Sequence, residues 1–381
     1  MFAMRAFLVI TILLTLCTTQ VVRAQSVALK YSLNTGGDLR SATFSPDGSL
    51  LAIVSGTRTE ISFWDSATGK SIAKFSTGKD PANYVGESSF LLTMPRPGFM
   101  RLRFSPDARI LAVAAQVTRD VRLWDMKTGK LFTTLSGVKA LKSFEFSPDG
   151  RMLALAMGAQ GLKLIDVYTG QPRSDRWNFK HVETITGVDF SKDGTTLIVA
   201  VSSTNDRNSG FYFVDIASGT IKSRILSPAS HIVIGQTNHD RSRVLTFESS
   251  NLKVWDLNTG QLKNTINAGS SKIIDATISY DGLRVAAITK DGKVQTWDAD
   301  TSVLRREIQE LSDKPIYVSF APDPDIALIV SAKSVKIWSQ SRGDVSPPLA
   351  EARTPFDFSP NGQFLITARK GGGAQLWEIR K

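Results

Sequence analysis

The stretch FSPDGSLLAIVSGTRTEISFWDSATGK, residues 44–70, decides the fold, because a close copy of it follows further along the chain. FSPDARILAVAAQVTRDVRLWDMKTGK occupies residues 104–130. In both copies a tight-turn sequence precedes two apolar runs, and the second run ends in Trp-Asp and another turn. The runs have the length and composition of β-strands and show no helical periodicity. The sequence therefore predicts a repeated, all-β unit.

Alignment on the first residue of the tight turn gives eight such units. These turn positions are Ser45, Ser105, Ser147, Ser191, Asn238, Ser279, Ala321 and Ser359. The third apolar run of each unit ends at Trp64, Trp124, Ile165, Val214, Trp255, Trp297, Trp338 and Trp377. A period of about 41 residues with strand-type runs is typical of radial or stacked β-repeats.

The turn residues have a direct structural explanation. In SPDG, proline presets φ, aspartate accepts hydrogen bonds from the backbone ahead of it, and glycine takes the left-handed conformation that ends the turn. Glycine has the same role after the third strand, as at Gly69 and Gly129. Tryptophan supplies a large apolar surface where neighbouring sheets pack. We interpret these repeated residues as structural.

These motifs resemble the WD40-repeat β-propellers, in the FSPDG and WD..TGK form of bacterial members, over residues 25–381. The resemblance implies a single domain in which four-stranded blades surround a central channel. We predict eight blades; seven blades plus a decayed unit is the alternative, since the family most often has seven. The last unit ends after its third strand, and SVALKYSL at residues 26–33 belongs to no unit. This N-terminal strand is expected to close the last blade.

The chain departs from the family in one respect. Many members carry a hydrogen-bond relay of histidine, aspartate, serine or threonine, and tryptophan. Here only His181 stands in the corresponding position before a first strand, and its own unit has Val214 in place of tryptophan. We therefore expect the relay to be absent and the blades to be held mainly by apolar packing.

Residues 1–24 are predicted to be a secretory signal peptide. Arg5 precedes the apolar run AFLVITILLTLC, and Val22-Arg23-Ala24 ends it near small residues. The run is too short to cross a bilayer core. We expect an exported protein, periplasmic or extracellular, without a transmembrane segment after cleavage. A lipoprotein anchored at Cys17 is the alternative, although Leu16 is bulky where a lipidation site has a small residue.

Composition limits the chemistry and the partners. Cys17 is the only cysteine, so the cleaved chain has no disulfide, thiol nucleophile or cysteine-ligated zinc. Lys and Arg number 46 against 35 Asp and Glu, and removal of Arg5 and Arg23 leaves a net charge of +9. Such a chain attracts acidic proteins, anionic envelope polymers or lipid headgroups, and we expect no nucleic acid. Scattered surface charge is the alternative, because no run of five like charges occurs.

Two departures from the repeat indicate a binding rim. Residues 76–99, STGKDPANYVGESSFLLTMPRPGF, contain an insertion of about seventeen residues, and residues 202–210, SSTNDRNSG, are four or five residues longer than their counterparts. Both connections open on the same face of a propeller, whereas the SPDG and TGK turns line the other. Irregular loops on a regular scaffold are where binding residues concentrate. We name the first face the irregular rim and the second the turn face.

The candidate partner-binding residues come from these loops and from QPRSDRWNFKH, residues 171–181, which combines an aromatic side chain with positive charge. For Trp177, and for the aromatic residues of the long insertion, burial between blades is an equal alternative. The acidic candidate is interpreted as part of a polar hairpin tip rather than a calcium loop. The candidates are Tyr84, Phe90, Arg96, Phe99, Arg173, Arg176, Trp177, His181 and Asp206.

No catalytic motif is present, and we expect no cofactor. His181, His231 and His239 lack close metal-ligand spacing, so a metal site is not expected. RKGGGAQ at residues 369–375 lies between strands and is interpreted as a hairpin rather than an anion-binding nest. The sequence favours a non-enzymatic scaffold that binds proteins or an envelope polymer. The alternative is a propeller hydrolase or lactonase with a metal-assisted site at the channel mouth. Oligomeric state is left open.

Overall fold

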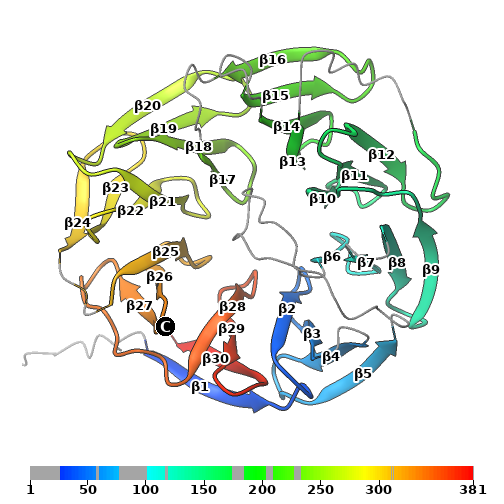
Figure 1. The fold of residues 1–381 in the computed structure, drawn as a ribbon, viewed down its shortest axis with the longest axis horizontal. Helices are drawn as coiled ribbons and strands as arrows, with labels where there is room; N and C mark the ends of the chain where they lie inside the picture. Colours follow the sequence, from blue (N-terminus) through cyan, green and yellow to red (C-terminus); the bar gives the residue numbers. More distant parts are fainter. Residues whose placement is uncertain are drawn as a thin grey trace, which may run out of the picture.

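The fold is a closed ring of eight antiparallel sheets around a central axis (Figure 1). The computed structural model describes residues 26–56, 60–76, 101–115, 119–173, 184–202, 209–226, 233–309, 311 and 313–380. The first strand of each sheet lies nearest the axis, and the fourth lies at the circumference. Within the described ranges there is no helix, and hence none long and apolar enough to span a membrane. The prediction of eight blades is confirmed.

The blades follow one another in chain order. Blade 1 contains β2 (Leu39–Phe44), β3 (Leu50–Ser55), β4 (Glu60–Asp65) and β5 (Ser71–Ser76). Blade 2 contains β6 (Arg101–Phe104), β7 (Ile110–Ala115), β8 (Asp120–Asp125) and β9 (Lys130–Leu135). Blade 3 contains β10 (Ser143–Phe146), β11 (Met152–Ala156) and β12 (Leu162–Asp166). Blade 4 contains β13 (Thr184–Phe190), β14 (Thr196–Ser202), β15 (Gly210–Asp215) and β16 (Ile221–Leu226).

The second half of the ring repeats the pattern. Blade 5 contains β17 (Val233–Thr237), β18 (Arg243–Glu248), β19 (Asn251–Asp256) and β20 (Leu262–Asn267). Blade 6 contains β21 (Ile273–Ile278), β22 (Arg284–Thr289), β23 (Val294–Asp298) and β24 (Leu304–Ile308). Blade 7 contains β25 (Pro315–Phe320), β26 (Ile326–Ser331) and β27 (Val335–Ser339). Blade 8 contains β28 (Ala352–Phe358), β29 (Phe364–Arg369), β30 (Ala374–Arg380) and β1 (Ser26–Leu33).

The N-terminal strand closes the ring, as predicted. β1 pairs antiparallel with β30, in a register that runs from Ser26 opposite Arg380 to Leu33 opposite Ala374. Leu33 is buried in the apolar cluster shared by blades 8 and 1. Because the two ends of the chain share one sheet, the last blade has no open edge beside β30.

The tight turns confirm the chemistry expected of SPDG. In blade 1 the Ser45 hydroxyl donates to Asp47 Oδ1 at 2.5 Å and accepts the Leu50 amide at 2.9 Å. The Ser45 side chain is buried, so these bonds satisfy a polar group that water does not reach. The same pair recurs in blades 2, 3, 4 and 6. A buried serine that orders the turn explains why the turn motif repeats.

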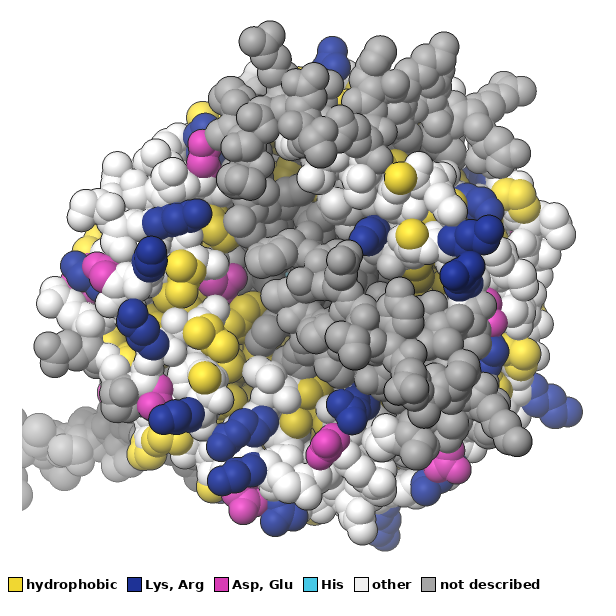
Figure 2. Space-filling model, in the orientation of Figure 1, with side chains coloured by type: hydrophobic (Ala, Val, Ile, Leu, Met, Phe, Trp, Pro, Cys, Tyr) yellow, Lys and Arg dark blue, Asp and Glu magenta, His cyan; other side chains and the backbone are white. Residues whose placement is uncertain are grey.

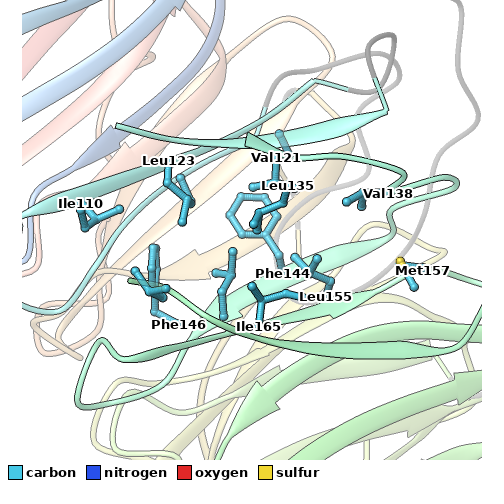
Figure 3. Close-up of a cluster of buried hydrophobic side chains, with 14 residues drawn as sticks. Ile110, Val121, Leu123, Leu135, Val138, Phe144, Phe146, Leu155, Met157 and Ile165 are labelled. Carbon is cyan, nitrogen blue, oxygen red and sulfur yellow. The ribbon is translucent and has the colours of Figure 1, made fainter. Parts of the chain in front are cut away.

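The apolar core lies between blades rather than inside them (Figure 3). Between blades 2 and 3, Leu123 and Leu135 pack against Phe146 and Leu155, and each is almost fully buried. A sheet with two apolar faces needs a neighbour on each side, and the ring supplies both. The alternation of buried side chains along each strand therefore produces the propeller.

One part of the relay that we expected to be absent is present, namely the hydrogen bond between tryptophan and a hydroxyl group. The indole Nε1 of Trp255 donates to Thr246 Oγ1 of the neighbouring strand at 2.9 Å, and Trp377 donates to Thr367 in the same way. In blade 1 the Trp64 indole donates to Ser62 Oγ of its own strand at 2.9 Å, whereas the Trp338 indole nitrogen is buried without a partner among the described residues. The expected absence of the relay therefore needs correction in blades 1, 5 and 8, where a serine or threonine hydroxyl accepts a hydrogen bond from the tryptophan.

Candidate binding surfaces around the central channel

A β-bulge recurs in the first strands that line the channel. In blade 6, Ile273 pairs with Thr289 and Asp275 with Ile288, so Ile274 is left without a partner. Blade 7 repeats this arrangement, and Ile316 is left unpaired. A bulge inserts one extra residue and turns its side chain in a new direction. Among the described first strands, the bulges at single residues are those at Arg40, Thr186, Ile274 and Ile316.

The bulges of blades 6 and 7 expose apolar side chains on neighbouring strands. Ile274 is 40% exposed and Ile316 is 52% exposed, although most apolar residues of β21 and β25 are buried. Both residues lie near the start of the first strand, at the irregular rim. Figure 2 shows hydrophobic side chains, in yellow, gathered over β21 and β25 beside the centre of the ring.

Lysines surround these two isoleucines. Lys272 and Lys314 precede the isoleucines by two residues, and Lys290 and Lys333 lie in the rim turns of the same blades. All four side chains are exposed, and none makes an ion pair with another described residue. We name this surface the basic sector; it comprises Lys272, Ile274, Lys290, Lys314, Ile316 and Lys333. Figure 2 shows Lys and Arg side chains, in dark blue, around the yellow group.

The backbone beneath the basic sector is held by hydrogen bonds. The Lys290 amide donates to the Lys272 carbonyl at 2.8 Å, which joins the two rim segments of blade 6. In blade 7, the Ser334 hydroxyl donates to Asp313 Oδ2 at 2.9 Å. The lysine side chains therefore project from ordered turns.

Asp275 follows Ile274 on β21, and its side chain is half-buried. No cation lies beside it among the described residues. Its Oδ2 accepts the Val318 amide at 2.8 Å, which ties β21 to β25. Desolvation raises the pKa of this carboxyl to about 7, and the hydrogen bonds from the Val318 and Ala276 amides oppose that rise only in part.

We expect Asp275→Asn to flatten the pH dependence of stability. The folded-state pKa lies above the unfolded value, so the folded chain binds more protons between about pH 4 and 7, and stability falls as pH rises through that window. Asparagine keeps the acceptor for Val318 but cannot ionise. Because the side chain is half-buried, we expect a gain of only about 1 kcal/mol at pH 8. Urea unfolding of both proteins at several pH values measures the difference; parallel profiles would contradict the prediction.

The opposite end of the channel contains a network of charges. Arg103, Glu145 and Asp189 each occupy the penultimate position of a first strand, in blades 2, 3 and 4. Arg103 Nε lies 3.3 Å from Glu145 Oε2. Arg241, from the tight turn of blade 5, reaches Asp189 Oδ1 at 3.0 Å and Glu145 Oε1 at 3.8 Å. Two arginines thus link four consecutive blades.

A second group of residues extends this network across the channel. Desolvation raises the pKa of Asp357 to about 6, while the charge of Arg103 and hydrogen bonds such as that from the Phe44 amide lower it in part. Desolvation, reinforced by Asp357, raises the pKa of Tyr280 to about 12. His239 stacks on Tyr280 with ring centroids 4.4 Å apart. Blades 5, 6 and 8 therefore also contribute.

The network has the character of a structural brace. Glu145 and Asp189 each form an ion pair with an arginine, and the charge of Arg103 also acts on Asp357. Among the described residues, no group of three or more histidines, cysteines or carboxylates could hold a metal. The described residues therefore give no support to a metal-assisted hydrolase, which the sequence left as an alternative.

Comparison with known proteins agrees with this geometry. No family model matches the chain. Autophagy-related protein 16 of Arabidopsis thaliana is 25% identical over 268 residues, which are 68% of this chain and 52% of that protein. Nuclear distribution protein PAC1 of Arthroderma benhamiae is 23% identical over 325 residues, which are 83% of this chain and 57% of that protein. This chain spans about half the length of the curated relatives that it matches.

Solved structures show the same fold. The C-terminal WD40 domain of Sif2 has a TM-score of 0.68 at 15% identity, and the match covers 93% of this chain and 99% of that domain. The comparisons support a WD40-repeat β-propeller. In this propeller the basic sector lies at the irregular rim and the charge network lies at the turn face.

Most of the residues predicted from the sequence lie outside the described residues. Those are Tyr84, Phe90, Arg96, Phe99, Arg176, Trp177, His181 and Asp206. Arg173 is described: it is exposed, and its amide donates to the Leu164 carbonyl at 2.8 Å on the outer edge of blade 3. Their role in binding stays a prediction.

Both described surfaces were missed by sequence reasoning about this chain. A signal for the charge network exists, because blades 5 and 6 have NHDR and SYDG where blades 1 and 3 have SPDG. Penultimate charges in the first strands are a second signal. The basic sector has a weaker signal, the repeated order Lys-x-Ile at residues 272–274 and 314–316.

Proposed function

We propose that this chain is an exported, non-enzymatic scaffold that binds a protein partner or an anionic envelope polymer through its irregular rim. The observation that carries the proposal is the basic sector, where the exposed isoleucines of β21 and β25 lie beside exposed lysines of hydrogen-bonded rim segments. Such a mixture fits a macromolecular partner better than a small substrate, because it is open and has no convergent catalytic groups.

The resemblance to WD40 propellers supports the scaffold, since function in this fold depends on surfaces added to a constant ring. The two relatives reported above are named for autophagy and for nuclear distribution, and neither name is that of an enzyme. The long insertion at residues 76–99 stands between β5 of blade 1 and β6 of blade 2, and the sequence predicts that it lies on the same rim as the basic sector. Both features would then act on one face.

Export is proposed from residues 1–24 and is tested separately. These residues, fused to alkaline phosphatase, are expected to yield an enzyme that is active only outside the cytoplasm, because that reporter needs disulfides. Replacement of Leu13 and Leu14 by aspartate in the apolar run should abolish that activity. Equal activity of the two fusions would remove the export proposal.

The scaffold is tested by affinity capture from the envelope fraction of the source cells. Residues 25–381 are the bait, beside a variant that lacks residues 80–98 and a control with Lys70→Glu and Lys130→Glu on the turn face. We expect specific partners that are retained by the control and lost with the rim deletion. Partners that are indifferent to the deletion, or a stoichiometric metal together with hydrolytic activity, would overturn the proposal. Circular dichroism of each bait checks folding.

A further inference from the structure

We propose that the basic sector docks an acidic peptide segment of a protein partner, whose apolar residues contact Ile274 and Ile316. This inference rests on the proposed function and assigns it a site and a chemistry. The sector lies within the described part of the chain, so it is separate from the long insertion.

The apolar half of the site is built by the fold. Ile274 and Ile316 occupy equivalent bulges on β21 and β25, which lie side by side in the ring. Exposed isoleucine costs free energy in proportion to its apolar area, and cover by another apolar side chain recovers it. Two such residues on adjacent blades form a small double anchor rather than a large apolar patch.

The charged half gives the site its preference for acidic residues. Lys272, Lys290, Lys314 and Lys333 present four ammonium groups over two blades, without ion-pair partners among the described residues. The carboxylates of the same turns are engaged: Asp291 accepts the Thr289 hydroxyl at 2.5 Å and Asp313 accepts that of Ser334. Lysine is a flexible point charge that suits carboxylates at varied positions along an extended chain.

The hydrogen-bonded turns of the basic sector also favour a peptide as the ligand. The Lys314 stem lies beside Gly292 of blade 6, where a Cβ atom would be 3.8 Å from Lys314 Cγ, so the lysines of the two blades form one continuous surface. Because the turns are already held by hydrogen bonds, binding would immobilise side chains but little backbone.

A bilayer or a nucleic acid fits these residues less well. Peripheral membrane binding grows with buried apolar area, and two partly exposed isoleucines supply little. Binding of single-stranded nucleic acid uses exposed aromatic rings on which bases stack. None of the six residues of the basic sector is aromatic. Acidic and apolar residues together on one segment match what the sector offers.

The test uses a fluorescein-labelled peptide of about twelve residues, a repeat of Glu-Glu-Leu, and the purified chain in an anisotropy titration. Matched probes are a Glu-Glu-Gly repeat, a Lys-Lys-Leu repeat, and vesicles of equal parts phosphatidylglycerol and phosphatidylcholine. We expect saturable binding of the Glu-Glu-Leu peptide only, and weaker binding at about 300 mM than at about 50 mM salt.

Variants locate the binding on the chain. Lys290→Glu with Lys314→Glu should weaken it at least about tenfold, and Ile316→Ser about fivefold. The turn face supplies matched controls, Lys70→Glu with Lys130→Glu and Ile72→Ser, since Ile72 is 56% exposed beside Lys70. These should change the affinity less than about twofold. Circular dichroism and melting temperature confirm that each variant folds.

Several outcomes would overturn the inference: no saturable peptide binding, equal losses in sector and control variants, or binding of vesicles in place of the peptide. The affinity capture separates this failure from that of the scaffold itself. Partners that are retained by the Lys290→Glu and Lys314→Glu bait but lost with residues 80–98 would leave the scaffold standing and exclude the basic sector as its site.

Discussion

Deletion of β1, residues 26–33, is expected to cost the protein its cooperative fold. The strand is the outer member of blade 8, and its register with β30 spans seven residue pairs. Leu33 is buried, and Val27 and Tyr31 pack partly buried against the clusters on either side of blade 8. Burial of such side chains contributes about 2 kcal/mol each, so the loss approaches the whole stability of a typical domain.

The deletion also opens the ring. β30 would become an exposed edge with unpaired backbone groups, and such an edge promotes association between chains. We expect a melting temperature lower by at least about 10 °C, together with aggregates in size-exclusion chromatography. A synthetic peptide of residues 26–33, added in excess, should restore part of the loss. The same peptide with Leu33→Asp should not. A monomeric deletion variant with unchanged melting would show that β1 is dispensable.

The closing strand illustrates what sequence alone predicts well here. Eight turns of SPDG type and a last unit that ends after its third strand leave one strand over, and only one position remains open for it. Each of these inferences depends on residues close together in the sequence, such as Ser45 and Asp47, whose hydrogen bond the structure confirms. Because the same local pattern occurs eight times, a single irregular unit does not change the predicted fold.

The position of the basic sector depends on the pairing register of the strands, which the local sequence does not determine. Ile274 is exposed because β21 has one residue more than β22 between their paired positions, and pairing register cannot be read from an apolar run such as IIDATI. The exposed Lys290 lies near Ile274 because β21 pairs with β22 and the Lys290 amide donates to the Lys272 carbonyl. Sequence reasoning therefore located irregular loops but not the sector beside them.

The charge network shows a similar limit. The replacement of glycine by Arg241 is visible in NHDR, but the direction of its side chain depends on Glu145 and Asp189, which are far away in the sequence. Contacts that combine three blades have no local signature. The turn motif predicted the backbone at Arg241 correctly and was silent on the role of the side chain.

Arg241→Gly tests whether this network stabilises the ring, and the direction of the change decides it. Arg241 has a φ of 58°, in the left-handed region that glycine occupies in most of the other tight turns. A non-glycine residue there costs about 1 kcal/mol. If the side chain contributed nothing, glycine would stabilise the protein by about that amount. We expect the opposite, a loss of about 2 kcal/mol in the free energy of unfolding.

The expected loss follows from the carboxylates that would remain. The Asp189 side chain is 11% exposed and the Glu145 side chain 22%, so neither is well solvated once the guanidinium is removed. Breaking a buried pair by removal of one partner costs more than the pair itself contributes, because a charge is left in a poorly solvated position. Glu145 keeps Arg103 at 3.3 Å, whereas Asp189 loses its ion pair with Arg241 at 3.0 Å, so we expect the larger share of the loss from Asp189.

A second substitution separates this cause from a simple packing effect. Asp189→Asn in the Arg241→Gly background should recover more than half of the lost stability, because it removes the carboxylate charge that Arg241 had paired. Arg109→Ala is the control, since Arg109 pairs with Asp107 at 3.7 Å and its side chain is 80% exposed. That exposed pair should contribute at most about 0.5 kcal/mol. Urea unfolding at pH 7 measures all four proteins, and a more stable Arg241→Gly variant would mean that the arginines do not brace the channel.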